Sequence, residues 1–210
     1  MSIIDQTVIV VDNHERMRDI IGTLLSSVGF TVISFDSAEA LLAVEFPVQA
    51  SCLISDVRMP GRSGLELQDH LRRSGIHLPV VFVTAYADVP ITVRAMKAGA
   101  IDVLSKPFRE QELLDAVQRA VKAGEAWRRE AATVGELWAR FETLTRRERD
   151  IVSLVAAGRL NKQIAAELGV TEITVKTHRG HLMRKMHARS LPELVRMIDR
   201  IAPPECSWAA

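Results

Sequence analysis

The chain has 210 residues, 48% hydrophobic and 25% charged, a composition that excludes an intrinsically disordered protein. Its two cysteines exclude a disulfide framework and a zinc-binding spacing, so we expect a reducing, cytoplasmic environment. No apolar run approaches the ~20 residues of a membrane span, and the N-terminus lacks the features of a signal peptide. Residues 1–110 carry ten Lys and Arg against thirteen Asp and Glu, whereas residues 141–201 carry twelve against seven, which favours an anionic partner for the second half.

Apolar runs rich in β-branched residues alternate with segments of helical periodicity over the first 120 residues. The predicted strands are residues 7–11, 31–35, 52–55, 80–84 and 101–104. The predicted helices run from about His14 to Val28, then from a Ser37 cap, then through Leu65 and Leu71, then through Val89, Val93 and Met96, and finally through Val117 and Val121. This alternation predicts a doubly wound (βα)5 domain of the α/β class, with a parallel sheet covered on both faces.

Four polar residues stand at or just beyond the ends of these strands: Asp12, Asp56, Thr84 and Lys106. Ligands of such sheets bind beyond the carboxyl ends of the strands. Two carboxylates on neighbouring strands suit Mg2+, and a lysine suits a phosphoryl oxygen. The set therefore indicates transfer of a phosphoryl group to an Asp oxygen. Each residue alone also permits a structural role, with Asp12 capping a helix and Lys106 in an ion pair.

Four segments make residues 5–122 resemble the receiver domain of a two-component response regulator: VIVVDNHERMR, LISDVRMPGRSG, VVFVTAYAD and LSKPF. The resemblance implies that Asp56 accepts a phosphoryl group from a sensor histidine kinase. It implies that Thr84 is the switch hydroxyl, that Lys106 binds the phosphoryl group, and that the Lys106-Pro107 bond is cis. It also implies a Mg2+ site formed by Asp12, Asn13, Asp56 and the backbone carbonyl of Arg58.

Two positions depart from the pattern of that family. Asn13 stands where a second acidic residue is usual, so we expect weaker Mg2+ binding. Val103 stands at the switch position that often carries an aromatic side chain, so Thr84 is expected to carry more of the switch. These departures leave open a regulator that responds to a protein or small ligand and ignores phosphorylation.

An enzyme is a further alternative, because aspartyl-phosphate phosphatases also use Asp, Thr, Lys and Mg2+ on a doubly wound sheet. Those enzymes carry a second aspartate two residues after the nucleophile as general acid. Arg58 occupies that position here, so we expect that the chain is not an enzyme.

The middle of the chain is predicted to be one long helix, from Arg109 to about Phe141, because it contains no proline and only two glycines, Gly124 and Gly135. Each glycine costs about 1 kcal/mol relative to alanine, so a bend or fraying is expected there. Trp127 and Trp138 are expected to pack against a domain or a second chain.

Residues 144–187 have the pattern of a helix-turn-helix. The predicted second helix begins with Asn161 as N-cap, and Thr171 caps the third, whose inner face is Val175, Leu182 and Met186. A solvated three-helix bundle without a DNA partner is the structural alternative. His178 and His181 are spaced as metal ligands, but the sequence shows no acidic partner, so packing and phosphate contact are favoured.

LTRRERDIV, AAGRLNKQIAAELGV and TVKTHRGHLMRKM make residues 141–201 resemble a LuxR-type DNA-binding domain. With the receiver, this resembles the NarL/FixJ family, and the motifs are most similar to those of FixJ-type regulators. The resemblance implies binding of double-stranded promoter DNA and a homodimer formed through the last helix, which Ser190 and Glu193 are predicted to cap. The predicted DNA-binding residues are Asn161, Lys162, Thr174, Lys176, Thr177, Arg179, Gly180 and Arg184.

The predicted organisation is a receiver domain at 1–122, a helical linker at 123–140, a four-helix, all-α DNA-binding domain at 141–201 and a tail at 202–210.

Overall fold

The computed structural model describes residues 6–46, 50–85 and 88–201. The chain divides into two compact units, residues 1–128 and 129–210. The predicted tail at 202–210 lies outside the described residues. Among the described helices, none is both long and apolar enough to cross a lipid bilayer.

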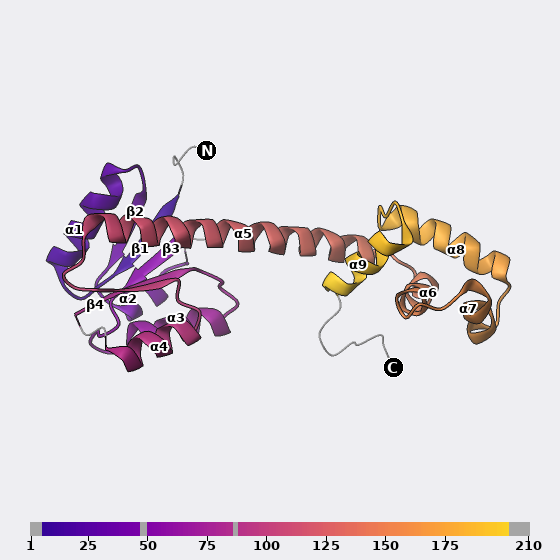
Figure 1. Ribbon diagram of the computed structural model, residues 1–210, viewed down its shortest axis with the longest axis horizontal. Helices are drawn as coiled ribbons and strands as arrows, with labels where there is room; N and C mark the ends of the chain where they lie inside the picture. Colours follow the sequence, from indigo (N-terminus) through magenta and orange to yellow (C-terminus); the bar gives the residue numbers. More distant parts are fainter. Residues whose placement is uncertain (1–5, 47–49, 86–87, 202–210) are drawn as a thin grey trace. The chain divides into compact units, whose positions relative to one another are not determined.

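The first unit is built on a five-stranded parallel sheet with the strand order β2-β1-β3-β4-β5. The strands are β1 (Thr7–Val11), β2 (Thr31–Phe35), β3 (Ala50–Ser55), β4 (Val80–Thr84) and β5 (Asp102–Ser105). The helices between them are α1 (Glu15–Ser27), α2 (Ala38–Leu42), α3 (Gly64–Arg73) and α4 (Val89–Lys97), and α5 (Glu110–Glu142) follows β5. The predicted (βα)5 architecture is confirmed (Figure 1).

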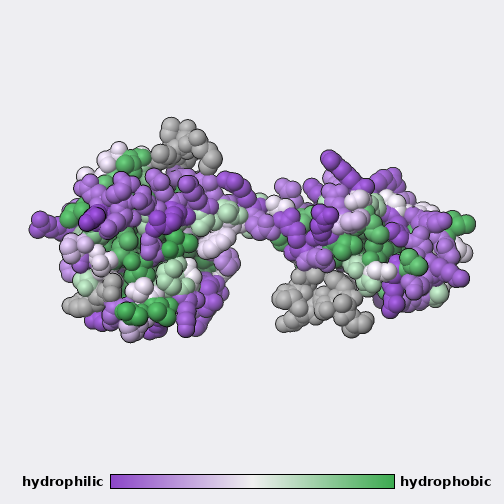
Figure 2. Space-filling model, in the orientation of Figure 1, coloured by the Kyte–Doolittle hydropathy of each residue, from purple (hydrophilic) through white to green (hydrophobic). Residues whose placement is uncertain are grey.

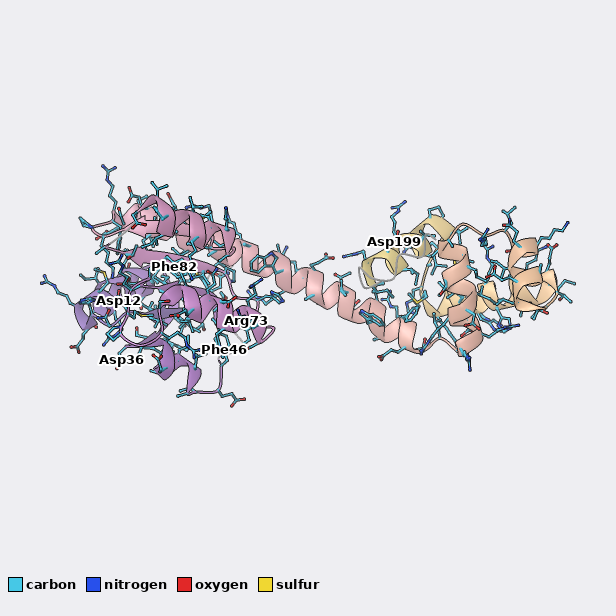
Figure 3. The ribbon with its side chains drawn as sticks, turned by 90° about the horizontal axis from the view of Figure 1, so that it is seen from below. Asp12, Asp36, Phe46, Arg73, Phe82 and Asp199 are labelled. Atoms are coloured by element: carbon cyan, nitrogen blue, oxygen red, sulfur yellow. The ribbon has the colours of Figure 1, made fainter. Side chains whose placement is uncertain are left out.

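Successive strand residues point to opposite faces of the sheet, and each face has its own apolar core. Ile9, Leu53 and Phe82 lie in the core that α2, α3 and α4 cover. Val10 and Ile54 lie in the core that α1 and α5 cover. Phe82 is completely buried in β4 (Figure 3). Because both faces are covered, a charged side chain on a strand reaches solvent only at the strand end.

The fourth predicted helix is confirmed as α4, although the three residues that mark it in the sequence do not face the sheet. Val89, Val93 and Met96 of α4 are all exposed. The helix packs on the sheet through Ala95, which is buried, and Ile91, which is partly buried and lies four residues earlier. Several apolar stripes fit so short a helix, so periodicity alone does not show which one faces the sheet.

Helix α5 is continuous over 33 residues, as predicted, and passes through both glycines without a break. Gly124 is required by packing, because a Cβ atom there would lie 3.0 Å from Pro79 and 3.1 Å from the Ser51 carbonyl oxygen. The Arg128 guanidinium donates to the Ala50 carbonyl at 3.1 Å. Close contact with the sheet unit thus explains a glycine that helix propensity disfavours.

The two linker tryptophans are less buried than expected. Trp127 and Trp138 are 44% and 41% exposed. Trp138 makes an edge-on contact with Phe141, with ring centroids 5.6 Å apart. The part of the prediction that involves a second chain stays a prediction.

The second unit consists of the end of α5 and four helices around one core. These helices are α6 (Arg146–Ala156), α7 (Asn161–Leu168), α8 (Glu172–Lys185) and α9 (Leu191–Ile201). Thr171 caps α8 as predicted, with its side chain accepting from the Thr174 N–H. Asn161 is not the N-cap of α7, because Leu160 occupies that position and its N–H donates to the Gln163 side chain.

Hydrophilic residues predominate on the faces of both units drawn in Figure 2.

Candidate functional site

The sheet brings Asp12 and Asp56 together. Each follows the last residue of its strand, and the strands pair so that Val11 lies opposite Ser55. The Asp56 N–H donates to the Val11 carbonyl at 2.9 Å. Asp12 and Asp56 are only 1% and 5% exposed. Two carboxylates are therefore held at the carboxyl edge of the sheet, as predicted, in surroundings that make their mutual repulsion costly.

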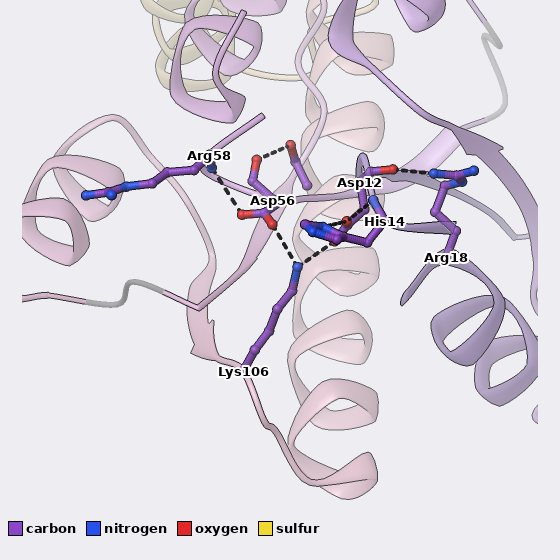
Figure 4. A network of polar contacts seen from close by, with 7 residues as sticks. Asp12, His14, Arg18, Asp56, Arg58 and Lys106 are labelled. Atoms are coloured by element: carbon purple, nitrogen blue, oxygen red, sulfur yellow. Dashed lines mark hydrogen bonds and ion pairs between the residues drawn. The ribbon is translucent and has the colours of Figure 1, made fainter. Parts of the chain in front are cut away.

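Lys106 follows the outer strand β5 and reaches these carboxylates at the same edge of the sheet. Its Nζ atom lies 2.6 Å from Asp12 Oδ2 and 2.7 Å from Asp56 Oδ2 (Figure 4). The Lys106 N–H donates to the Thr84 carbonyl at 2.8 Å, and the Lys106-Pro107 bond is cis, as expected. The ammonium thus offsets the repulsion between the carboxylates. The ion pair that the structural alternative predicted is present, and it places a cation at the oxygen expected to react.

His14 and Arg18 also contact Asp12, which sequence reasoning did not predict. Asp12 Oδ1 accepts from the His14 N–H at 2.8 Å and lies 3.2 Å from His14 Nδ1. Arg18 donates to the Asp12 carbonyl at 2.7 Å. The side chain of an aspartate commonly accepts the N–H two residues ahead, which is the signal that predicts the His14 contact. Asp12 therefore has a local structural role as well as a place in the cluster.

The donor set suits a metal ion. One ligand atom each of Asp12, His14 and Asp56 lies within 4.8 Å of the others. Carboxylate oxygens are ligands that Mg2+ prefers. Asn13, predicted as a ligand, is exposed beside this cluster. The Asp12 and Asp56 carboxylates therefore fit a hard divalent cation such as Mg2+.

An open cleft of about 470 Å³ gives access to the cluster. Its lining residues are His14, Arg16, Met17, Ile20, Asp56, Arg58, Ala85 and Lys106. The Arg58 N–H donates to Asp56 Oδ1 at 3.1 Å. Two residues after Asp56, the exposed Arg58 side chain offers no carboxylic acid.

Gly64 fixes the loop that carries Asp56, and sequence reasoning missed it. Its N–H donates to the Val57 carbonyl at 3.0 Å. A Cβ atom at Gly64 would lie 2.2 Å from the Asp56 carbonyl oxygen and 2.7 Å from Ser55 Oγ. The close approach of two backbone segments therefore requires glycine at this position.

The two predicted switch residues lie on neighbouring strands. Thr84 ends β4 and is buried, and Ser105 is its partner on β5. Val103 pairs with Phe82 and packs partly buried against the core beneath α2, α3 and α4. Both residues therefore lie on the β4–β5 side of the sheet, next to the strand that leads to Lys106.

Helix α8 of the second unit has one buried and one exposed side. Val175, Leu182 and Met186 are buried, as predicted. Of the predicted DNA-binding residues, five are exposed and three are partly buried. The exposed residues are Lys162, Lys176, Thr177, Gly180 and Arg184, and the partly buried ones are Asn161, Thr174 and Arg179. Arg179 donates to the Asn161 side chain and so links α8 to the start of α7.

The view that no acidic residue joins the two histidines is wrong. Buried Glu148 of α6 offers a carboxylate oxygen within 4.8 Å of nitrogen atoms of His178 and His181. However, Glu148 Oε2 already accepts from the Thr145 N–H at 2.8 Å and from Lys185 Nζ at 2.7 Å. Lys185 thus balances the one carboxylate of this group and leaves no net negative charge for a metal ion, whereas Asp12 and Asp56 together exceed the charge of Lys106. These contacts support the structural role for the histidines and link α6 to α8.

Glu148→Gln should destabilise the second unit by about 1–2 kcal/mol, since a charged hydrogen bond within a buried network is lost. Burial alone would raise the pKa of Glu148, but hydrogen bonds from Lys185 and Thr145 outweigh it and hold the pKa below the ordinary 4.5. The carboxylate of the wild type therefore stabilises the fold above pH 4.5, and this contribution is lost as the pH falls through the lowered pKa. Hydrogen exchange of α6 and α8 peptides should show faster opening of the variant at pH 7. Equal exchange at pH 7 would contradict this role of Glu148.

Two family models match the chain, one for each half. Residues 8–118 match the response regulator receiver domain, and residues 142–198 match the luxR family of bacterial regulatory proteins. The first match contains the carboxylate cluster, and the second contains α6, α7 and α8.

Individual proteins match the chain along most of its length. Nodulation protein W of Bradyrhizobium diazoefficiens is 51% identical over 92% of this chain and 86% of its own length. Transcriptional regulatory protein FixJ of Rhizobium meliloti is 42% identical over 92% of this chain and 95% of its own. Among solved structures, response regulator StyR is 45% identical with a TM-score of 0.78, covering 93% of this chain and 99% of that one.

Proposed function

Because the chain belongs to the bacterial response regulators that join a receiver domain to a LuxR-type DNA-binding domain, we propose that phosphorylation of Asp56 controls its binding to promoter DNA. The observation that carries the proposal is the position of Asp56. Its carboxylate ends a buried strand, faces an open cleft and lies 2.7 Å from Lys106 Nζ. The donor is a sensor histidine kinase, the kind of partner that a receiver domain implies.

The reaction is transfer of a phosphoryl group to an Asp56 carboxylate oxygen. The new bond joins that oxygen to phosphorus, while the bond from phosphorus to the kinase histidine nitrogen breaks and its electron pair stays on the imidazole. Lys106 stabilises the charge that develops on the phosphoryl oxygens. Its Nζ is already within hydrogen-bond distance of the reacting carboxylate and needs only a small movement.

Asp12, Asp56, the Asn13 amide and the Arg58 carbonyl would hold Mg2+ beside the reacting oxygen. When bound, it neutralises the negative charge of the phosphoryl group. Asn13 contributes an oxygen without a formal charge, so the site is weaker than one with a third carboxylate.

Phosphorylation of Asp56 changes the positions of Thr84 and β5. The added phosphoryl oxygens accept a hydrogen bond from the Thr84 hydroxyl, and Val103 on β5 adjusts to the new position. This change favours a homodimer, and two copies of α8 then contact the two half-sites of a symmetric promoter in the cytoplasm. Lys176, Thr177 and Gly180 face the major groove, while Asn161 and Lys162 approach the backbone phosphates.

Acetyl phosphate with Mg2+ tests the proposal on the full chain. Duplex DNA selected from a random library by the treated protein serves as the probe. The account predicts that treatment increases both the dimer fraction and the affinity for this duplex. If affinity and oligomer size stay the same although Asp56 is modified, phosphorylation does not control binding.

Asn13→Asp should tighten Mg2+ binding by about tenfold, since a third carboxylate adds charge to a hard-cation site. The residue is exposed, so the fold should tolerate the change. Isothermal titration of both proteins with MgCl2 measures the difference. If the affinities are equal, Asn13 does not face the metal.

A further inference from the structure

One exposed stripe of α8 begins with a large apolar side chain. Ile173, Thr177, Gly180 and Arg184 recur at i, i+4, i+7 and i+11, and all four are exposed. Residues at this spacing share one helix face. Between the start of the helix and Arg184, this stripe offers an isoleucine, a threonine and a glycine.

Ile173 is the most apolar point of the stripe. It is 77% exposed, the highest value among the exposed large hydrophobic side chains of the described residues. Neither core packing nor a helix cap explains it, since Thr171 is the cap of α8. An isolated exposed isoleucine is ordinary on a protein surface, so its neighbours decide its meaning.

The neighbours keep the stripe apolar and open. The Thr177 hydroxyl donates to the Ile173 carbonyl at 3.0 Å, so this polar group is engaged with the helix backbone. A Cβ atom added at Gly180 would meet nothing within 4 Å. A partner can therefore approach the helix backbone closely at Gly180, about two turns from Ile173.

The charge around the stripe suits an anionic partner such as DNA. Residues 171–189 carry five Lys and Arg against one Glu. Lys176 and Arg184 are exposed within the same helix. In the major groove, the apolar group that a base presents is the C5-methyl of thymine, and apolar side chains contact it.

We propose that Ile173 is a specificity-determining residue that contacts a thymine methyl group in each half-site. This inference rests on the proposed function, since it requires α8 to enter the major groove. It adds an apolar contact to the polar ones expected from Lys176 and Arg179.

Selection of duplexes from a random library provides the first test, with full-length wild type and Ile173→Ser, each treated with acetyl phosphate and Mg2+. The wild type should select one thymine per half-site that Ile173→Ser does not select, while the other positions stay the same. The substitution is at an exposed site, so the fold should persist, and circular dichroism checks this.

Replacement of that thymine by deoxyuridine provides the second test, because it removes only the methyl group. For the wild type, affinity should fall about threefold to fivefold per methyl, and for Ile173→Ser it should not change. Lys162→Ala is the matched control, since it should bind more weakly but keep the full effect of the methyl.

The outcomes separate this inference from the proposed function. If the wild type selects no sequence at all, the proposed function fails. If both proteins select the same sequence, or if the effect of the methyl survives in Ile173→Ser, the inference about Ile173 is wrong and the proposed function stands. If Thr177→Ser, and not Ile173→Ser, loses the effect of the methyl on affinity, then Thr177 makes the methyl contact and the inference is overturned.

Discussion

Asp56→Asn should accept no phosphoryl group from acetyl phosphate, and its affinity for the selected DNA should stay at the untreated value. The amide lacks the nucleophilic carboxylate oxygen, and it also lacks the charge that holds Lys106 at 2.7 Å. Intact-mass spectrometry measures the modification, and fluorescence anisotropy measures the affinity. The loss of phosphorylation should be complete, because the described residues place no other carboxylate beside both Lys106 and Asp12.

Asp36→Asn is the matched control. Asp36 also follows a strand at the same edge of the sheet, since β2 neighbours β1, but its side chain is exposed and contacts Ser37 (Figure 3). This variant should be modified and should respond as the wild type does. If Asp56→Asn still gains affinity after treatment, the acceptor is a different residue.

Lys176→Ala should weaken binding to the selected DNA by about 5- to 150-fold while phosphorylation stays unchanged. Lys176 is exposed on α8, next to the buried Val175 that anchors the helix. Loss of its ammonium removes a contact to a base or phosphate and does not affect the cluster of the other unit. Anisotropy with the selected duplex measures the affinity, and intact mass measures the modification.

Lys122→Ala controls for the loss of one positive charge. Lys122 is an exposed residue of α5 in the first unit, and its removal should change DNA affinity little at physiological salt. If both variants bind equally well, α8 does not face DNA. If Lys176→Ala is not phosphorylated, the functions have been assigned to the wrong units.

Local sequence patterns were sufficient to predict the sheet and the core of the charged site. Asp12 and Asp56 stand at the ends of adjacent strands because a parallel sheet aligns those ends. Strand identity followed from short apolar runs, and the long helix followed from the absence of proline.

Contacts that depend on tertiary packing were not predictable in this way. Helix α4 has more than one apolar stripe, and only packing decides which one faces the sheet. In the structure Ala95 is buried and Val93 is exposed. The position of Glu148 beside His178 depends on how α6 crosses α8, which no periodicity specifies. Gly64 is required by a backbone approach that exists only in the folded chain.

The most direct measurement is peptide mapping by mass spectrometry of the wild-type chain after treatment with acetyl phosphate and Mg2+. The account predicts one added phosphoryl group, located at Asp56, in the same sample that binds the selected DNA more tightly. An unmodified Asp56 in protein that nevertheless binds more tightly would contradict it.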